Sequence, residues 1–264
     1  MTTILGILNI TDDSFFDGGK YLEPAAAIAQ ARALAADGAD VLDIGAASSN
    51  PDSKGVAPEI EIARLQSVLP ALAGIPLSID TFSAPVQRWA LSQGVAYLND
   101  IQGFPDAALY PALAASRAKL IVMHSVQERG AATRVDIPPH AIMERLFRFF
   151  DARLAALEDA GVVRERLILD PGMGFFLGTD PETSFTVLRR LGELRQRFGL
   201  PLLVSVSRKS FLRRLTGRDA AGAGAASLAA ELFAIRQGTD YIRTHAPGPL
   251  KDALLLEKTL GNPA

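Results

Sequence analysis

One complete strand, loop and helix unit is contained in residues 166–198, which read RLILDPGMGFFLGTDPETSFTVLRRLGELRQRF. Residues 166–170 are apolar almost throughout, as expected for a parallel strand that is buried on both faces. Residues 181–198 have the spacing of an amphipathic helix. Asp180 and Pro181 supply a helix N-cap and a favourable first helical residue. The stretch therefore predicts a β-strand that leads through a loop into a helix.

The same unit recurs from one end of the chain to the other. Short apolar runs precede helical stretches at residues 4–9, 41–45, 76–80, 95–100, 119–124, 166–170, 201–206 and 240–245. A glycine stands before four of these runs, where helix C-caps are expected: Gly38, Gly94, Gly161 and Gly238. Eight such units favour a (β/α)₈ barrel over a doubly wound open sheet. No linker or composition break divides the chain, so we expect one domain over residues 1–264.

The composition is typical of a globular protein and argues against several kinds of partner. Hydrophobic residues make up 48% and the formal net charge is -2 without a basic run, so nucleic acid is not expected. The absence of cysteine excludes thiolate chemistry and suits a reducing compartment. No signal peptide and no bilayer-spanning run is found, so we expect a cytoplasmic protein without a membrane partner. No Walker, GxGxxG or HExxH pattern occurs.

Polar residues stand at the carboxyl ends of the predicted strands, where barrels of this type carry their chemistry. They are Asn9, Asp43, Asp80, Asn99 with Asp100, His124, Asp170, Ser207-Arg208-Lys209, and Arg243 with His245. Such an aspartate often only caps the next helix, and Asp43 best fits that structural role. Asp80 and Asp170 end apolar strands, where burial without a partner is costly, so we expect a ligand rich in N–H groups. His124 fits a packed residue and a ligand equally well.

The loops near these ends have compositions typical of binding segments, although ordinary surface loops would look similar. Residues 11–21 are polar and aromatic by turns and could form a lid. Residues 45–56 are rich in small hydroxyl residues and could hold an anion or a water. Residues 170–178 carry two phenylalanines that either wall a planar ligand or pack in the core. Residues 205–212 place cations at the start of a helix, which is a natural anion site.

These segments resemble the dihydropteroate synthase family. The shared blocks are GILNITDDSFFDGG (6–19), GADVLDIGAASSNPD (38–52), SIDT (78–81), YLNDIQGF (97–104), MH (123–124), LDPGMGF (169–175), SVSRKSF (205–211) and YIRTH (241–245). The resemblance implies a folate-pathway transferase that condenses 6-hydroxymethyl-7,8-dihydropterin pyrophosphate with p-aminobenzoate. Pterin-binding methyltransferases that serve corrinoid proteins lack the SRKS block and are the alternative. A non-catalytic barrel that only binds a ligand is a third interpretation.

The resemblance assigns the pterin to four residues, Asp80, Asn99, Asp170 and Lys209. Their acceptors suit the amino and ring N–H edge of a pterin, and the lysine suits its carbonyl edge. Asp17 matches a family residue that stabilises a developing cation, so Asp17, Lys209 and Asp80 are the expected catalytic residues. The implied reaction is dissociative, because pyrophosphate leaves first and the amine then attacks the cation. Its catalysis is expected to be electrostatic and positional.

The resemblance places the remaining ligands around the pterin. It implies that Asn9 binds the pyrophosphate through Mg²⁺, the expected cofactor. Arg243 and His245 are expected to bind the pyrophosphate directly through charge-assisted hydrogen bonds. The arylamine is assigned to Ser49, Phe175, Phe176 and Ser207. A homodimer is expected from the family.

Two departures from the common family pattern lie where the arylamine is expected. Residues 46–51 read AASSNP, where the family carries a Glu and an Arg around a Ser-Thr pair. Phe176 and Leu177 replace the usual Gly-Lys after GF. These changes, with residues 99–106 and 123–127, resemble the sulfonamide-insensitive members encoded by mobile resistance determinants. A bulky Phe176 is expected to exclude a drug's sulfonyl substituent and still admit p-aminobenzoate.

Overall fold

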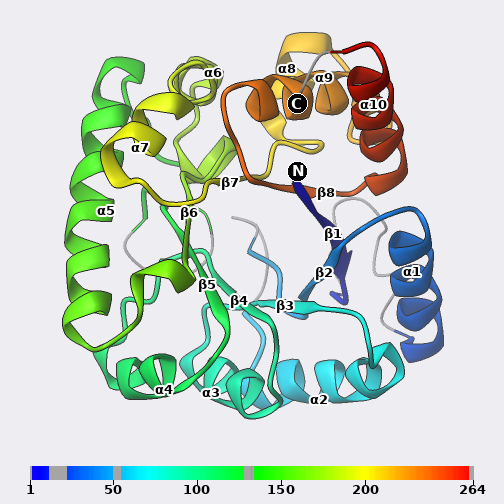
Figure 1. The fold of residues 1–264 in the computed structure, drawn as a ribbon, viewed down its shortest axis with the longest axis vertical. Coiled ribbons are helices and arrows are strands. Elements are labelled where there is room, and N and C mark those ends of the chain that lie inside the picture. Colours follow the sequence, from blue (N-terminus) through cyan, green and yellow to red (C-terminus); the bar gives the residue numbers. More distant parts are fainter. Residues whose placement is uncertain (1, 12–22, 50–54, 128–131, 133, 262–264) are drawn as a thin grey trace.

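Eight parallel strands form the wall of a barrel in the computed structural model, which describes residues 2–11, 23–49, 55–127, 132 and 134–261 (Figure 1). The strands are β1 (Thr3–Asn9), β2 (Val41–Gly45), β3 (Leu77–Asp80), β4 (Tyr97–Asp100), β5 (Lys119–Met123), β6 (Leu167–Asp170), β7 (Leu203–Val204) and β8 (Tyr241–Thr244). Their order around the sheet is β6-β5-β4-β3-β2-β1-β8-β7. The predicted (β/α)₈ barrel is confirmed.

The barrel closes at a short seam between β6 and β7. A single bridge joins Leu169 to Leu202, and the Leu169 N–H donates to the carbonyl of Pro201 at 2.9 Å. Strand β7 is much shorter than the predicted 201–206. Pro201 has no N–H to donate, and the Leu202 N–H donates to the Asp240 carboxylate at 2.9 Å instead of to a neighbouring strand. The ladder on this side is therefore short at its start.

Helices surround the strands on all sides (Figure 1). They are α1 (Pro24–Ala36), α2 (Pro58–Val68), α3 (Ala84–Ser92), α4 (Tyr110–Ala115), α5 (Ile142–Asp159), α6 (Pro181–Arg189), α7 (Leu191–Phe198), α8 (Ser210–Thr216), α9 (Gly224–Arg236) and α10 (Pro247–Thr259). The predicted helix 181–198 is thus two helices, which part at Arg190, where the backbone leaves helical geometry (φ −116°, ψ 17°). The predicted N-cap is confirmed, because the Asp180 carboxylate accepts the Glu182 N–H at 2.9 Å. Among the described residues, no helix is long and apolar enough to cross a membrane.

The register of the parallel ladder brings polar residues of successive strands to one level. Asn9 pairs with Gly45, Gly45 with Asp80, and Asp80 with Asn99. Side chains two residues apart on a strand share a face, so Leu5 lies on the same face as Asn9. Leu5 belongs to a separate cluster of buried residues with Val41, Ile121, Ile168, Leu203 and Tyr241. An apolar plug therefore fills the barrel below the polar level, and the site lies above it.

Candidate active site

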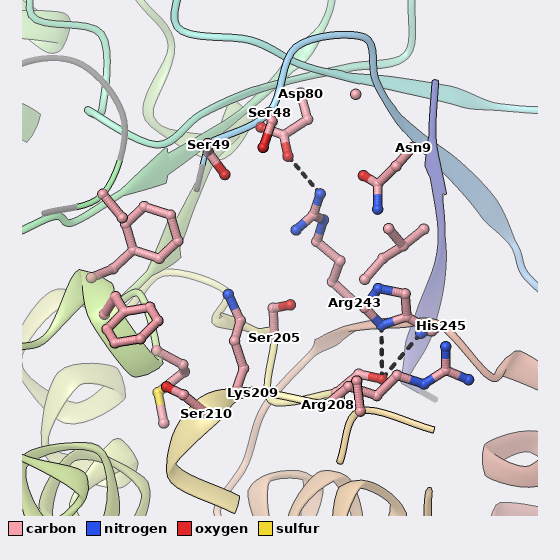
Figure 2. Close-up of a pocket in the computed structure, with 18 of the residues that line it drawn as sticks. Asn9, Ser48, Ser49, Asp80, Ser205, Arg208, Lys209, Ser210, Arg243 and His245 are labelled. Atoms are coloured by element: carbon pink, nitrogen blue, oxygen red, sulfur yellow. Dashed lines mark hydrogen bonds and ion pairs between the residues drawn. The ribbon is translucent and has the colours of Figure 1, made fainter. Parts of the chain in front are cut away.

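A cavity at the carboxyl end of the barrel brings together most of the predicted site residues (Figure 2). The predicted residues that line it are Asn9, Ser49, Asp80, Phe175, Phe176, Ser207, Lys209, Arg243 and His245. Asn99 and Asp170 are buried and do not line it. Asp17 lies outside the described residues. Eleven predicted residues therefore lie in or beside one site, although they come from segments that span the chain.

Arg243 crosses the site from β8 and binds two carboxylates. Its Nε donates to Asp43, and its Nη2 lies 2.5 Å from the Oδ2 of Asp80, as the dashed line in Figure 2 marks. Asp43 is fully buried, so its charge depends on this partner. The sequence favoured a structural role for Asp43. It is indeed held inside the protein, but it orients a cation at the centre of the site rather than capping a helix.

Lys209 and two carboxylates form the electrostatic centre of the site. Burial raises the pKa of Asp80 to about 7, although Arg243 and Lys209 oppose the rise. Burial also raises the pKa of Asp170 to about 6, although its carboxylate accepts the Gly172 N–H at 2.8 Å. Burial and Arg243 lower the pKa of Lys209 to about 8, whereas Asp170 and Asp80 raise it. Lys209 therefore interacts with both carboxylates, with Asp170 behind the cavity wall and with Asp80, which lines the cavity.

Asn99 is a buried acceptor that lacks a hydrogen bond. Its side-chain oxygen has no partner within the part of the chain that the structure describes. It lies on β4, directly beside Asp80 on β3. Buried polar atoms in native proteins are nearly always satisfied, so such an atom calls for a donor from outside the protein. A ligand with N–H groups at this position would supply one.

His245 and Ser207 contact each other across the β7 and β8 ends. The Ser207 hydroxyl accepts the backbone N–H of His245 at 3.2 Å and lies 3.1 Å from the His245 Nδ1. Burial lowers the pKa of His245 to about 3, and Arg208 and Arg243 lower it further. The imidazole is therefore neutral at physiological pH. Ser207 lines the cavity as predicted, and it also fixes the orientation of the histidine.

Phe175 and Phe176 form one side of the cavity from a single turn of 3₁₀ helix, Gly174–Phe176. Phe176 is buried against Ile101, Met123 and Ala132. The ring of Phe176 also lies 5.0 Å from the Lys209 ammonium. Gly172 makes this packing possible, because it has a φ of 69° and a Cβ there would meet the His124 carbonyl at 2.4 Å. Phe176 is thus a packed part of the cavity wall.

His124 packs beside the site without lining it. Its Nδ1 lies 3.3 Å from the carbonyl of Pro171, and its ring meets Phe149 edge to face at 5.1 Å. Burial lowers the pKa of His124 to about 3, and Arg145 lowers it further. Of the two interpretations left open by the sequence, the packed, hydrogen-bonded residue fits the contacts of the ring and of Nδ1, whereas the buried Nε2 has no partner among the described residues.

The His124→Gln variant should reveal this neutral histidine in the pH dependence of stability. The unfolded histidine takes up a proton below about pH 6.5, but the folded one does so only near pH 3. Its contribution is therefore fully present above pH 6.5 and is lost as the pH falls. Between pH 7.5 and 4.5, wild type should lose about 2–3 kcal/mol relative to the variant, which urea unfolding at both pH values would measure. A constant difference would contradict this expectation.

Five further polar residues line the cavity that the sequence did not single out: Thr11, Ser48, Ser205, Ser210 and Arg213. Two of them had a detectable signal. Ser205 lies two residues before Ser207 on an extended segment, so both face the same side. Arg213 lies three residues after Ser210 at the start of α8, which again places the two on one face. Within the described residues, no group of three or more histidine, aspartate or glutamate side chains could hold a metal ion.

Comparisons with known proteins identify the family to which this chain belongs. Residues 5–245 match the family of pterin binding enzymes. The chain is 63% identical to dihydropteroate synthase type-2 of Escherichia coli over 95% of its own length and 93% of the relative's. A dihydropteroate synthase of Xanthomonas albilineans in complex with 7,8-dihydropteroate superposes with a TM-score of 0.83 at 33% identity, covering 98% of this chain and 94% of the other.

A second structure of the Xanthomonas albilineans enzyme, with 4-aminobenzoic acid, gives a TM-score of 0.87 at 34% identity over 98% of this chain and 93% of that one. The resemblance that the sequence blocks indicated is thereby confirmed over almost the whole chain. The chain belongs to the dihydropteroate synthase family of pterin-binding enzymes.

Proposed function

We propose that this transferase condenses 6-hydroxymethyl-7,8-dihydropterin pyrophosphate with p-aminobenzoate and releases 7,8-dihydropteroate and pyrophosphate. The proposal is supported by family membership and by related structures that hold 7,8-dihydropteroate or 4-aminobenzoic acid. The observation that carries it is the set of buried acceptors around one lysine. Asp80, Asp170 and the unsatisfied Asn99 can accept from the amino and N–H edge of a pterin, and Lys209 can donate to its carbonyl edge.

Asp80 can bind the pterin and Arg243 at the same time. Its Oδ2 accepts from the Arg243 guanidinium in the free protein, and a carboxylate has further acceptor sites for a pterin N–H. Arg243 also pairs with Asp43, so two carboxylates orient its guanidinium. The remaining N–H groups of Arg243 can donate to the pyrophosphate, which is the role that the resemblance implies for this residue.

The pyrophosphate fits the opposite end of the cavity, where cations gather. Arg243, His245 and Arg208 line that end, and the neutral His245 can donate a hydrogen bond but adds no charge. Asn9 lies there as well, and its amide oxygen is a hard ligand of the type that Mg²⁺ accepts. Because the described residues offer no carboxylate cluster, phosphate oxygens and water would complete the coordination. Bound there, Mg²⁺ would neutralise charge on the leaving group.

The reaction then needs positioning and charge stabilisation from the protein. The bond between the pterin methylene carbon and the pyrophosphate oxygen breaks, and the electron pair leaves with pyrophosphate. The amine nitrogen of p-aminobenzoate forms the new C–N bond and loses one proton. We assign the arylamine to the side bounded by Ser49, Phe175, Phe176 and Ser207. Asp17 is proposed to stabilise the cation from the first loop. Alignment of the two substrates supplies most of the rate enhancement.

A coupled assay of dihydropteroate formation tests the proposal. The purified protein should form 7,8-dihydropteroate and release pyrophosphate when the pterin substrate and p-aminobenzoate are both present. A pterin-binding methyltransferase would release none under these conditions. A non-catalytic binding barrel would bind the pterin pyrophosphate in a calorimeter and leave it intact, and either outcome would overturn the proposal.

We also propose that the enzyme tolerates sulfonamides because Phe176 blocks the space beyond the amine subsite. The support is the position of Phe176, which lines the cavity, is only 7% exposed and packs against Ile101, Met123 and Ala132. A carboxylate is smaller than a substituted sulfonyl group, so the same wall still accepts p-aminobenzoate. Wild-type turnover should accordingly persist at sulfamethoxazole concentrations that inhibit an ordinary member of the family.

Replacing Phe176 by alanine should restore inhibition. The inhibition constant of sulfamethoxazole should fall by about tenfold or more, because a steric block of this kind is worth about 1–3 kcal/mol. The KM for p-aminobenzoate should change by less than about threefold. Phe175→Ala is the comparison, since Phe175 also lines the cavity but is more exposed. Unchanged inhibition of Phe176→Ala would end this explanation.

The homodimer, the cytoplasmic location and a mobile-resistance origin stay predictions.

A further inference from the structure

Helix α9 turns two polar side chains inward, toward the β7 and β8 ends. Ser227 and Glu231 are one helical turn apart and are both buried, with 5% and 2% exposure. They share this face with Ala234 and Ile235. Glutamate is rarely buried without a partner, because its charge loses the solvation of water. Neither residue lines the cavity, so the reaction described above leaves both without a role.

Ser227 holds the backbone of the segment that carries Lys209. Its hydroxyl accepts the N–H of Arg208 at 2.9 Å and donates to the Ala223 carbonyl at 2.7 Å. Arg208 has a φ of 58°, the left-handed region that residues other than glycine seldom adopt. This conformation persists only where the surroundings impose it. Because Arg208 stands between Ser207 and Lys209, it sets the directions of both side chains.

Glu231 holds the neighbouring segment that carries Arg243 and His245. The side chain of Thr244, which is fully buried, hydrogen-bonds the Glu231 carboxyl. The Thr244 hydroxyl in turn accepts the Ala246 N–H at 3.2 Å, so the contact reaches the backbone on the far side of His245. Glu231 also attracts the Arg208 guanidinium, so one carboxyl acts on both segments. Burial raises the pKa of Glu231 to about 7, and these two partners oppose the rise.

We propose that Ser227 and Glu231 are positioning residues that fix segments 207–209 and 243–245 against each other and so align the pyrophosphate end of the site. Glu231 acts on Thr244 and Arg208, the central residues of the two segments, and Ser227 acts on the backbone of Arg208. The two segments also meet directly at the contact between Ser207 and His245. A displacement of about 1 Å at a site of this kind can cost about 10²-fold in rate. The pair Ser227 and Glu231, which we call the clamp, therefore supports catalysis by holding the two segments in place. The inference rests on the proposed function.

The Glu231→Gln variant tests the clamp, because it keeps the shape of the side chain and removes its charge. The KM for the pterin pyrophosphate should rise about tenfold. The KM for p-aminobenzoate should rise less, because Ser207 alone of the four residues assigned to the arylamine lies on these two segments. Ser227→Ala should change the same two constants in the same direction, since it releases the Arg208 N–H. Glu231→Ala should be more severe than Glu231→Gln, because it also loses the acceptor for Thr244.

The matched control is Glu257→Gln. Glu257 lies on α10 and pairs with Arg236 of the same helix α9 at 2.7 Å, away from the cavity. It should leave both KM values unchanged. If Glu231 and Ser227 served stability alone, their variants would lower the active fraction and hence kcat, with both KM values as in wild type. That outcome, or an equal rise in both KM values, would overturn the inference.

The Ser227→Ala variant keeps the test decisive if Glu231→Gln does not fold. Wild-type turnover is measured in the same assay. A failure of the proposed function would therefore show in wild type, whereas a failure of this inference would show only in the variants.

Discussion

The Lys209→Met variant should lose about 10²–10³-fold in kcat/KM for the pterin pyrophosphate. Lys209 is a cation that interacts with both Asp80 and Asp170, and methionine fills similar space without charge or donor. The pterin would then lack its donor, and the two carboxylates would lose a neighbouring charge. Steady-state kinetics with p-aminobenzoate at saturation would measure the loss. Lys119→Met is the matched control, because Lys119 begins β5 at the opposite end of the barrel and contacts Tyr241.

The same lysine should govern the alkaline side of the pH profile. With its pKa lowered to about 8, Lys209 loses its charge in the free enzyme above that pH, so kcat/KM should decline there. Arginine stays charged over this range, and Lys209→Arg should lack that decline whatever its absolute rate. A Lys209→Met variant with wild-type kcat/KM, or the same decline in Lys209→Arg, would contradict this role.

The Arg243→Met variant should lower the free energy of unfolding by about 3–5 kcal/mol. It leaves the fully buried Asp43 and the largely buried Asp80 without their shared cation. Removing one partner of a buried pair costs more than the pair contributes, because an uncompensated charge remains. Urea unfolding of the ligand-free protein near neutral pH would measure the change. A loss below about 1 kcal/mol would show that the guanidinium is not the main partner of these carboxylates.

The double variant Asp43→Asn with Arg243→Met separates the two carboxylates. Asparagine has the shape of aspartate without its charge, so it should recover part of the lost stability. It should not recover turnover, since the pyrophosphate still lacks Arg243. Recovery of turnover by the double variant would exclude Arg243 from the pyrophosphate site.

The strands could be predicted because each has a local signal. An apolar run that ends in a polar residue placed β1 at 4–9 and β5 at 119–124, and the structure has Thr3–Asn9 and Lys119–Met123. The length of β7 could not be predicted in this way. It depends on Asp240, a residue 38 positions from Leu202 whose carboxylate takes the Leu202 N–H. Pairing between strands is set by such distant contacts, which no local pattern reveals.

The position of the site at the carboxyl ends of the strands could be predicted from the sequence, but the ion pairs within the site could not. Asn9, Asp80 and Asn99 had to meet because the ends of parallel strands share one edge. Nothing in the sequence indicated that Arg243 would pair with Asp43, which lies 200 residues away. Glu231 gave no signal either, because α9 is rich in alanine and its apolar residues do not mark one face. The roles of the individual site residues stay predictions until the variants are measured.

The short seam between β6 and β7 links pterin binding to the closure of the barrel. Asp170 ends β6, and Lys209 follows β7, so these two residues lie on opposite sides of the seam that a single bridge closes. A pterin bound to both residues would bridge the seam between β6 and β7 and add contacts between its two sides. The bound substrate would then help to close the barrel that surrounds it, and the barrel would be less tightly closed at this seam in the ligand-free protein.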